Sequence, residues 1–202
     1  MTVAKICGLT NLADARHAAE CGADLLGLIL VPTSPRAVSP EAAAEIVANL
    51  RAEGCVTRFV GVFTRDDADG INAILEQCAL DLAQLHSPRV APDSIIRPCI
   101  LARRAEGVVD WSLIQAPNVW ALLLDTPHAT LAGGTGLTWD WRLVAGSRPE
   151  GARLILAGGL TPDNVAEAIR MVRPWGMDVA TGVEARPGVK DSARVARFLQ
   201  AV

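Results

Sequence analysis

Hydrophobic residues along this chain gather in short, nearly continuous runs, and longer stretches of mixed character separate the runs. Runs without strict alternation are typical of strands in a parallel sheet whose outer face is covered by helices. The runs cover residues 3–7, 25–31, 58–63, 80–85, 95–101, 119–124, 154–157 and 178–180. The pattern therefore predicts eight buried strands.

The stretches between these runs carry apolar residues at i, i+3, i+4 and i+7, a spacing that puts them on one side of a helix. Four stripes of this kind are Ala43, Ile46, Val47 and Leu50; Ile71, Ile74, Leu75 and Cys78; Val165, Ala168, Ile169 and Val172; and Val195, Phe198, Leu199 and Val202. Each stripe has to lie on another element, so these stretches are predicted to be helices that cover the sheet.

Two helix starts are marked by a hydroxyl residue directly before a proline, a combination that caps a helix and fits its first turn. These starts are Ser39-Pro40 and Thr161-Pro162, and Thr10 is a further residue that can cap a helix. The helices after the fourth and fifth runs are the weakest. Residues 86–93 are interrupted by prolines, and residues 110–115 allow only one or two turns.

A strand followed by a helix, repeated eight times with right-handed crossovers, closes into a barrel. We therefore predict a (β/α)8 TIM barrel, an α/β fold with a parallel eight-stranded sheet, as a single domain over residues 1–202. This length lies at the lower limit of the fold, so trimmed helices and loops are expected. An open, doubly wound sheet is the alternative that the same pattern allows.

Composition limits the partners of the chain. Charged residues make up 20% of the sequence, the net charge is −3, and the arginines are scattered, which argues against nucleic acid and membrane surfaces. The five cysteines show neither a Cys-x-x-Cys pair nor metal-ligand spacing. We therefore expect no bound metal. Because the cysteine count is odd and the start of the sequence has no apolar targeting segment, we expect reduced thiols and a cytoplasmic location.

The chemically informative residues come at the ends of the predicted strands, because the active site of such a barrel forms there. Cys7 ends the first run and is followed by Gly8, so its thiol is delivered to the rim of the sheet. Asp125 is a lone carboxylate that follows the wholly apolar sixth run. Further candidates after other runs are Arg36, His86, Gly158, Gly159, Thr181 and Gly182.

Lys5 and Asp178 lie on the two strands that meet when the barrel closes. Alternation along the first strand places Lys5 on the same face as Cys7, which is the inside of the barrel. Because an unpaired buried ammonium is costly, we expect Lys5 to pair with Asp178 across the seam. The alternative is that Asp178 contacts a substrate directly.

Several short motifs, taken together and in this order, resemble the phosphoribosylanthranilate isomerase family of tryptophan biosynthesis. They are Lys5-Ile-Cys-Gly-Leu-Thr10, Ser34-Pro35-Arg36, Leu85-His86, Gly133-Gly134-Thr135-Gly136 with Trp139-Asp140-Trp141, Gly182-Val183-Glu184 and Pro187-Gly188-Val189-Lys190. The resemblance implies a cofactor-independent Amadori rearrangement. In this reaction N-(5-phosphoribosyl)anthranilate becomes 1-(2-carboxyphenylamino)-1-deoxyribulose 5-phosphate.

The resemblance also implies catalytic roles. Opening the ribose ring needs an acid and forming the enol needs a base, and Asp125 matches the family's acid and Cys7 its base. A thiol is a credible base only if its pKa falls, which nearby cations can achieve. Apolar surroundings would help Asp125 to hold its proton at neutral pH.

The substrate has two anionic ends, so two anion sites are expected. Arg36 matches the family residue that receives the anthranilate carboxylate, a task suited to a planar guanidinium. The phosphate is expected on backbone N–H groups near the last two strands, which is its usual position in such barrels. The residues concerned are Gly158, Gly159, Thr181 and Gly182. His86, Asp178 and Gly134, the last in a loop beside Asp125, are further candidates for substrate contacts.

Two other functions fit part of the sequence. One is a related phosphate-binding barrel enzyme, such as a sugar-phosphate epimerase, that uses a metal held by His and Asp or a lysine–glutamate pair. Only one of the three histidines, His86, follows a core strand, which argues against the metal route. The other is a non-catalytic barrel that binds a phosphorylated ligand. Composition allows either a monomer or a homodimer.

Overall fold

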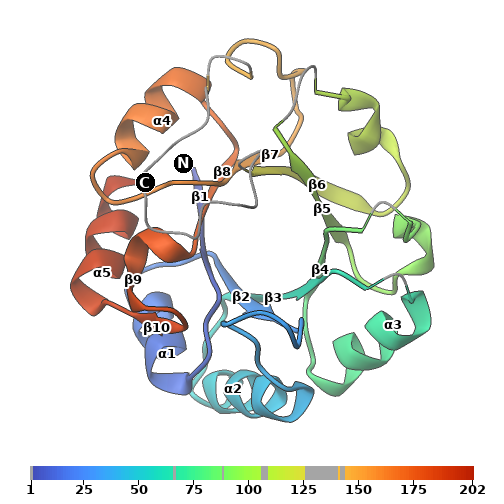
Figure 1. The fold of residues 1–202 in the computed structure, drawn as a ribbon, viewed down its shortest axis with the longest axis vertical. Helices are drawn as coiled ribbons and strands as arrows, with labels where there is room; N and C mark the ends of the chain where they lie inside the picture. The colour runs from blue at the N-terminus through green and yellow to red at the C-terminus, as the bar shows by residue number, and fades with distance from the viewer. Residues whose placement is uncertain (1, 66, 88, 106–108, 126–140, 142–143) are drawn as a thin grey trace.

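Eight parallel strands form a closed barrel in the computed structural model, which describes residues 2–65, 67–87, 89–105, 109–125, 141 and 144–202. Figure 1 shows the strands arranged in a ring with the helices outside it. In order around the ring the strands are β1 (Val3–Cys7), β2 (Leu25–Ile29), β3 (Arg58–Phe63), β4 (Leu82–Leu85), β5 (Cys99–Arg104), β6 (Val119–Asp125), β7 (Leu154–Leu156) and β8 (Gly176–Val179). The predicted TIM barrel is confirmed.

The barrel closes where its first strand meets its last. β1 pairs in parallel with β2 on one side and with β8 on the other, so Lys5 has Leu25 and Asp178 as its register partners. An open sheet would leave its two edge strands unpaired. The doubly wound alternative is therefore wrong.

Helices cover the outside of the ring. Those in the described ranges are α1 (Leu12–Glu20), α2 (Pro40–Ala52), α3 (Ala68–Gln77), α4 (Val165–Val172) and α5 (Ser192–Ala201). The two weak helical segments predicted after β4 and β5 are short 3-10 turns, η1 (Pro92–Ser94) and η2 (Trp111–Gln115). No helix among the described residues is both long and apolar enough to cross a membrane.

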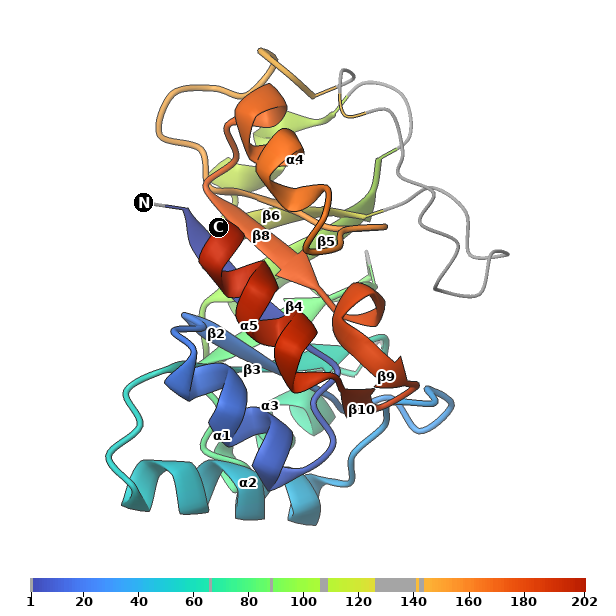
Figure 2. The ribbon, with the colours of Figure 1, turned by 90° about the vertical axis from the view of Figure 1, so that its left-hand side faces the viewer.

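The chain after β8 forms a compact unit that the hydrophobic pattern did not predict. A 3-10 turn, η4 (Thr181–Val183), leads into a two-stranded antiparallel hairpin of β9 (Glu184–Arg186) and β10 (Val189–Lys190). Figure 2 shows this hairpin directly before α5, near one end of the barrel. It therefore joins the rim where β8 ends to the outer helix layer.

The helix starts agree with the sequence at α2 and differ at two other helices. The hydroxyl of Ser39 accepts the N–H of Ala42 at 3.2 Å, as predicted. The cap of α1 is Asn11, because Thr10 instead donates its hydroxyl to the Gly188 carbonyl of the hairpin.

The start of α4 also lies later than the sequence predicted. The helix begins at Val165, because the side chain of Asn164 holds the preceding residues in a turn. Its Oδ1 accepts the N–H of Thr161 at 2.8 Å, and its Nδ2 donates to the Gly159 carbonyl at 2.9 Å.

The core has two layers, one inside the barrel and one between the strands and the helices. Every residue of the predicted α2 stripe is buried in the outer layer. The inner layer comprises Leu25, Val60, Leu82, Ile100, Ala102, Ala121, Leu123, Ile155 and Ala157. Half-buried Trp120 and Trp175 pack against it, with ring centroids 4.8 Å apart. These two rings lie near the N-terminal ends of β6 and β8 and fill that end of the barrel interior. The inward-facing polar residues lie at the opposite end, where the strands finish.

Candidate active site

Cys7 is the last residue of β1, and its side chain lies on the inward face with that of Lys5 two residues earlier. The side chain is buried, with 5% exposure. Gly27 is its register partner on β2, and a Cβ atom at Gly27 would lie 2.8 Å from the Cys7 Sγ atom. The absence of a side chain at Gly27 therefore makes the space that the thiol occupies.

Lys5 and Asp178 form an ion pair across the closing seam of the barrel. The Nζ atom of Lys5 donates to Oδ1 of Asp178 at 3.0 Å, and the lysine is completely buried. Burial lowers the pKa of Lys5, but attraction to Asp178 and to Cys7 outweighs it, so the pKa lies above its ordinary value. The predicted pairing is confirmed.

The protonation of Cys7 is set by opposing influences. Burial raises the pKa of the thiol, and Asp178 adds to this, whereas Lys5 and Lys190 lower it. The net effect is a pKa above the ordinary thiol value. The expectation that nearby cations would bring this pKa down is therefore wrong in direction, because the cost of burying a thiolate exceeds the attraction of the cations.

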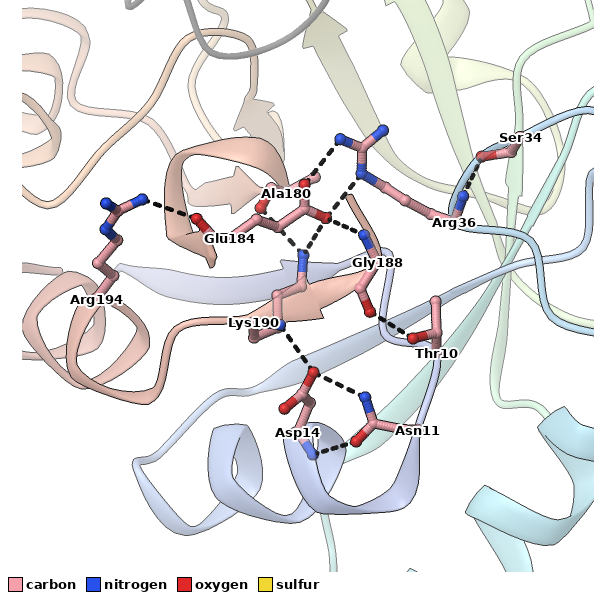
Figure 3. A network of polar contacts seen from close by, with 10 residues as sticks. All are labelled: Thr10, Asn11, Asp14, Ser34, Arg36, Ala180, Glu184, Gly188, Lys190 and Arg194. Atoms are coloured by element: carbon pink, nitrogen blue, oxygen red, sulfur yellow. Dashed lines mark hydrogen bonds and ion pairs between the residues drawn. The ribbon is translucent and has the colours of Figure 1, made fainter. Parts of the chain in front are cut away.

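Arg36 is held by a network that the hairpin supplies, as Figure 3 shows. Its Nε and Nη2 atoms donate to the two carboxylate oxygens of Glu184 at 2.7 and 2.8 Å. Oε1 of Glu184 also accepts from the N–H of Gly188 and from Nζ of Lys190, both at 3.2 Å. Within the described part of the chain, the Nη1 group of Arg36 has no hydrogen-bond partner. The guanidinium is thus fixed on one edge and available on the other.

Glu184 and Lys190 are functional candidates that the sequence reasoning did not single out. Their side chains are 3% and 1% exposed, although both residues carry a charge. Lys190 also donates to the carbonyl of Ala180 at 3.0 Å, which ties the hairpin to the end of β8. The only signal in the sequence is an acid and a lysine on either side of the Pro187-Gly188 turn, within the motifs quoted above.

Asp125 and His86 lie at the same end of the barrel as Cys7. Asp125 ends β6 half-buried and shares its strand face with Ala121 and Leu123, which line the barrel interior. His86 follows β4, with its Nε2 atom 3.0 Å from the amide nitrogen of Gln84. His86 is an exposed residue, yet desolvation by the surrounding protein lowers the pKa of its imidazole, against the attraction of Asp125.

Charged groups from both sides of the barrel mouth, the end where the strands finish, influence the pKa of His86. Lys5 lowers its pKa and Asp178 raises it, in addition to the effect of Asp125. The charges of the β1–β8 seam and the charge at the end of β6 therefore all act on the His86 imidazole. The Asp125 carboxylate and the seam that holds the thiol therefore lie at the same end of the barrel.

Two glycine-containing segments meet after the last two barrel strands. Gly158 and Gly159 adopt left-handed φ values of +88° and +66°, which glycine reaches without strain. A Cβ atom at Gly182 would collide with the carbonyl oxygen of Leu160, so the η4 turn lies directly against the loop after β7. Thr181, half-buried, precedes Gly182 in that turn. The predicted residues are brought together, whereas Gly134 lies outside the described residues.

These observations define a class of protein: a TIM barrel whose thiol, carboxylates and cations gather at the C-terminal ends of the strands, as in barrel enzymes. The family model described as N-(5'phosphoribosyl)anthranilate (PRA) isomerase matches residues 4–201. The chain belongs to this isomerase family, which confirms the resemblance inferred from the motifs.

Similar proteins cover nearly the full length of the chain. The N-(5'-phosphoribosyl)anthranilate isomerase of Geobacter sulfurreducens is 44% identical, over 99% of this chain and 98% of its own length. That of Geotalea uraniireducens is 42% identical over the same shares. The crystal structure of phosphoribosyl anthranilate isomerase from Thermotoga maritima has a TM-score of 0.89 and 35% identity, covering 100% of this chain and 98% of that one.

One solved relative carries a bound ligand. It is a phosphoribosyl anthranilate isomerase in complex with reduced 1-(o-carboxyphenylamino)-1-deoxyribulose 5-phosphate. Its TM-score is 0.83 and its identity is 33%, over 100% of this chain and 98% of that one.

Proposed function

We propose that this protein converts N-(5'-phosphoribosyl)anthranilate to 1-(2-carboxyphenylamino)-1-deoxyribulose 5-phosphate by an Amadori rearrangement in tryptophan biosynthesis. The observation that carries the proposal is the full-length family match together with a thiol at the end of β1 and a carboxylate at the end of β6, at one barrel mouth. The rearrangement is an internal redox exchange between two sugar carbons, so proton transfers are sufficient for it.

Asp125 is the proposed general acid for ring opening. Its proton goes to the ring oxygen of the ribose as the bond from that oxygen to the anomeric carbon breaks. The anthranilate nitrogen supplies the electron pair, and a protonated imine forms. A carboxyl group at the end of β6 suits this step because it lies at the barrel mouth, across the ring from the thiol.

Cys7 is the proposed general base for the second step. Burial disfavours its thiolate, so the proposal relies on the support that the thiolate receives from the neighbouring ammonium groups of Lys5 and Lys190. The Cys7 thiolate takes the proton from the sugar carbon next to the imine, and the electron pair left behind forms the enol. Tautomerisation of the enol, with the proton returning at the former imine carbon, gives the ketose product. A base on β1 and an acid on β6 reach the sugar from opposite arcs of the barrel.

Arg36 and the two glycine segments are the proposed anchors for the ends of the substrate. The Nη1 edge of Arg36, opposite the edge held by Glu184, binds the anthranilate carboxylate. The phosphate lies on the N–H groups of Gly158 and Gly159 and on the η4 turn, where glycines allow close approach to the backbone. His86 and Asp178 are proposed to contact the sugar between these anchors.

Replacing either proposed catalytic residue tests the mechanism. Cys7→Ala and Asp125→Asn are expected to fold and to lower kcat by about 10²- to 10⁴-fold, the usual contribution of a positioned acid or base. The loss of substrate fluorescence, followed with freshly made phosphoribosylanthranilate, measures the rate. Cys55→Ala and Asp93→Asn are matched controls away from the barrel mouth. A near-normal rate in either active-site variant removes that residue from the mechanism, and no turnover by the unmodified protein removes the function.

A further inference from the structure

Lys5 has no part in the proton transfers proposed above, although it is a completely buried charged residue at the seam of the barrel. Its side chain is among the largest that solvent does not reach, with 0% exposure. A buried ion pair is a poor source of stability, because desolvating two charges costs about as much as their attraction returns. The Lys5–Asp178 pair therefore calls for an explanation beyond holding β1 to β8.

The position of Gly27 shows how close the Lys5 ammonium lies to the Cys7 thiol. A Cβ atom at Gly27 would lie 3.2 Å from Nζ of Lys5 and 2.8 Å from Sγ of Cys7. The two atoms thus border the same small space, which only a glycine leaves open. Lys5 and Cys7 also project from one face of β1, and Asp178 holds the ammonium from β8 at 3.0 Å.

The other cations near Cys7 share a single carboxylate, that of Glu184. Lys190 is bound to Glu184 and to the Ala180 carbonyl, and Arg36 is bound by both oxygens of Glu184. The groups that face the thiol or its opening are Lys5, Asp178, Lys190 and Arg36, with Asp125, His86 and Arg103 further round the mouth. Lys5 is the largest of the influences that favour the thiolate, ahead of Lys190.

We propose that Lys5 is a positioning residue for Cys7: its ammonium, anchored by Asp178, stabilises the thiolate that takes the proton from the substrate. This inference rests on the proposed function for its link to catalysis. Asp178 has two opposite effects, because it fixes the ammonium beside the thiol and adds a negative charge of its own. The two residues of the ion pair are therefore expected to shift the ionisation of Cys7 in opposite directions.

Titration of the Cys7 thiolate tests the proposal independently of turnover. Ultraviolet absorbance of each variant, minus that of the same variant carrying Cys7→Ser, isolates this thiolate from the other four cysteines. Lys5→Met is expected to raise the titration midpoint by at least about 1 pH unit, the smallest effect typical of an opposite charge at close range. Asp178→Asn is expected to lower it. The ascending limb of kcat/KM against pH should move with each midpoint.

A double variant covers the case in which Lys5→Met does not fold because Asp178 is left buried and unpaired. Lys5→Met/Asp178→Asn removes both charges, and its midpoint is expected between those of Lys5→Met and the unmodified protein. Unchanged midpoints in the folded variants would overturn the proposal. The Lys5–Asp178 pair would then serve only to hold β1 to β8. Full turnover by Cys7→Ala would instead overturn the proposed base, while a shifted thiolate midpoint would still support the pairing of Lys5 with the thiol.

Discussion

Arg36 presents one free edge because Glu184 holds the other. A bidentate contact with a carboxylate fixes the plane of a guanidinium, so less conformational freedom is lost when a second anion binds. The Arg36 side chain also lies over Gly8, where a Cβ atom would come 2.8 Å from its Cδ atom. A residue at the end of β1 and a residue of the hairpin thus orient an arginine that follows β2.

Arg36→Ala tests the binding role. We expect KM to rise about 10- to 100-fold, because hydrogen bonds to charged groups contribute about 1.5 to 3 kcal/mol. A smaller change is expected in kcat. The measurement is a set of initial rates over a range of substrate concentrations.

Arg16→Ala is the matched control for Arg36→Ala. Arg16 makes the same bidentate contact with a glutamate, Glu53, but on the exposed surface. Its loss should leave KM unchanged. A KM for Arg36→Ala equal to that of the control would show that the carboxylate binds elsewhere.

The β9–β10 hairpin acts as an element because its charged residues are tied to both the barrel and the outer helices. Glu184 contacts Arg36, its carbonyl accepts from Arg194 of α5 at 2.7 Å, and the N–H of Lys190 donates to Asp14 of α1 at 2.8 Å. Figure 3 shows these contacts radiating from the hairpin. The hairpin therefore fixes the arginine and the helices with one set of polar contacts.

Acid stability reports on this element. Burial opposes the ionisation of Glu184, but Arg36, Lys190 and the Gly188 N–H hold its pKa below the ordinary value of 4.5. A carboxylate with a lower pKa in the folded state adds stability above its unfolded pKa and loses it as pH falls through the folded value. When the pH is lowered from about 5 to about 2, the unfolding free energy of Glu184→Gln is thus expected to decrease less than that of the unmodified protein.

Urea unfolding at a series of pH values measures this effect. Glu53→Gln is the control, since the pKa of Glu53 is also lowered by an arginine, but the pair is exposed and so contributes little. If the unfolding free energies of Glu184→Gln and the unmodified protein changed equally with pH, the ionisation of Glu184 would not contribute to stability.

At the scale of helices and strands, the sequence predicted the features that depend only on neighbouring residues. The bounds of β1 and β3 and the four buried residues of α2 follow from runs and spacing that need no distant partner. The hairpin did not follow, because its short polar strands carry no hydrophobic period and Glu184 meets Arg36 only after 148 residues of separation. The direction of the Cys7 pKa was missed for a related reason, since the sequence shows neighbouring charges but not the depth of burial.

The whole barrel divides its two ends between stability and chemistry. At the N-terminal end of the strands, Trp120 and Trp175 pack edge to face, and the guanidinium of Arg153 lies 5.3 and 5.5 Å from their ring centroids. The thiol, the carboxylates and the glycine segments lie at the other end. The residues that close the N-terminal end of the barrel are thus remote from the proposed reaction.

Trp120→Ala tests this division. We expect a loss of about 3 kcal/mol of unfolding free energy, the lower end for a tryptophan in a core because this ring is half-buried. The kcat of the folded enzyme should stay within about twofold, since about 0.4 kcal/mol in the barrier corresponds to that factor. Chemical denaturation and initial rates below the unfolding transition measure the two quantities. A fall in kcat without a loss of stability would contradict the division.

The seam between β1 and β8 has a consequence for biosynthesis of the protein. Lys5 leaves the ribosome 173 residues before Asp178, its partner across the seam. A nascent or C-terminally truncated chain therefore lacks the surroundings that tune the thiol, however well its earlier strands have formed. Enzymatic activity in this barrel therefore reports that β8 has been made and has closed on β1.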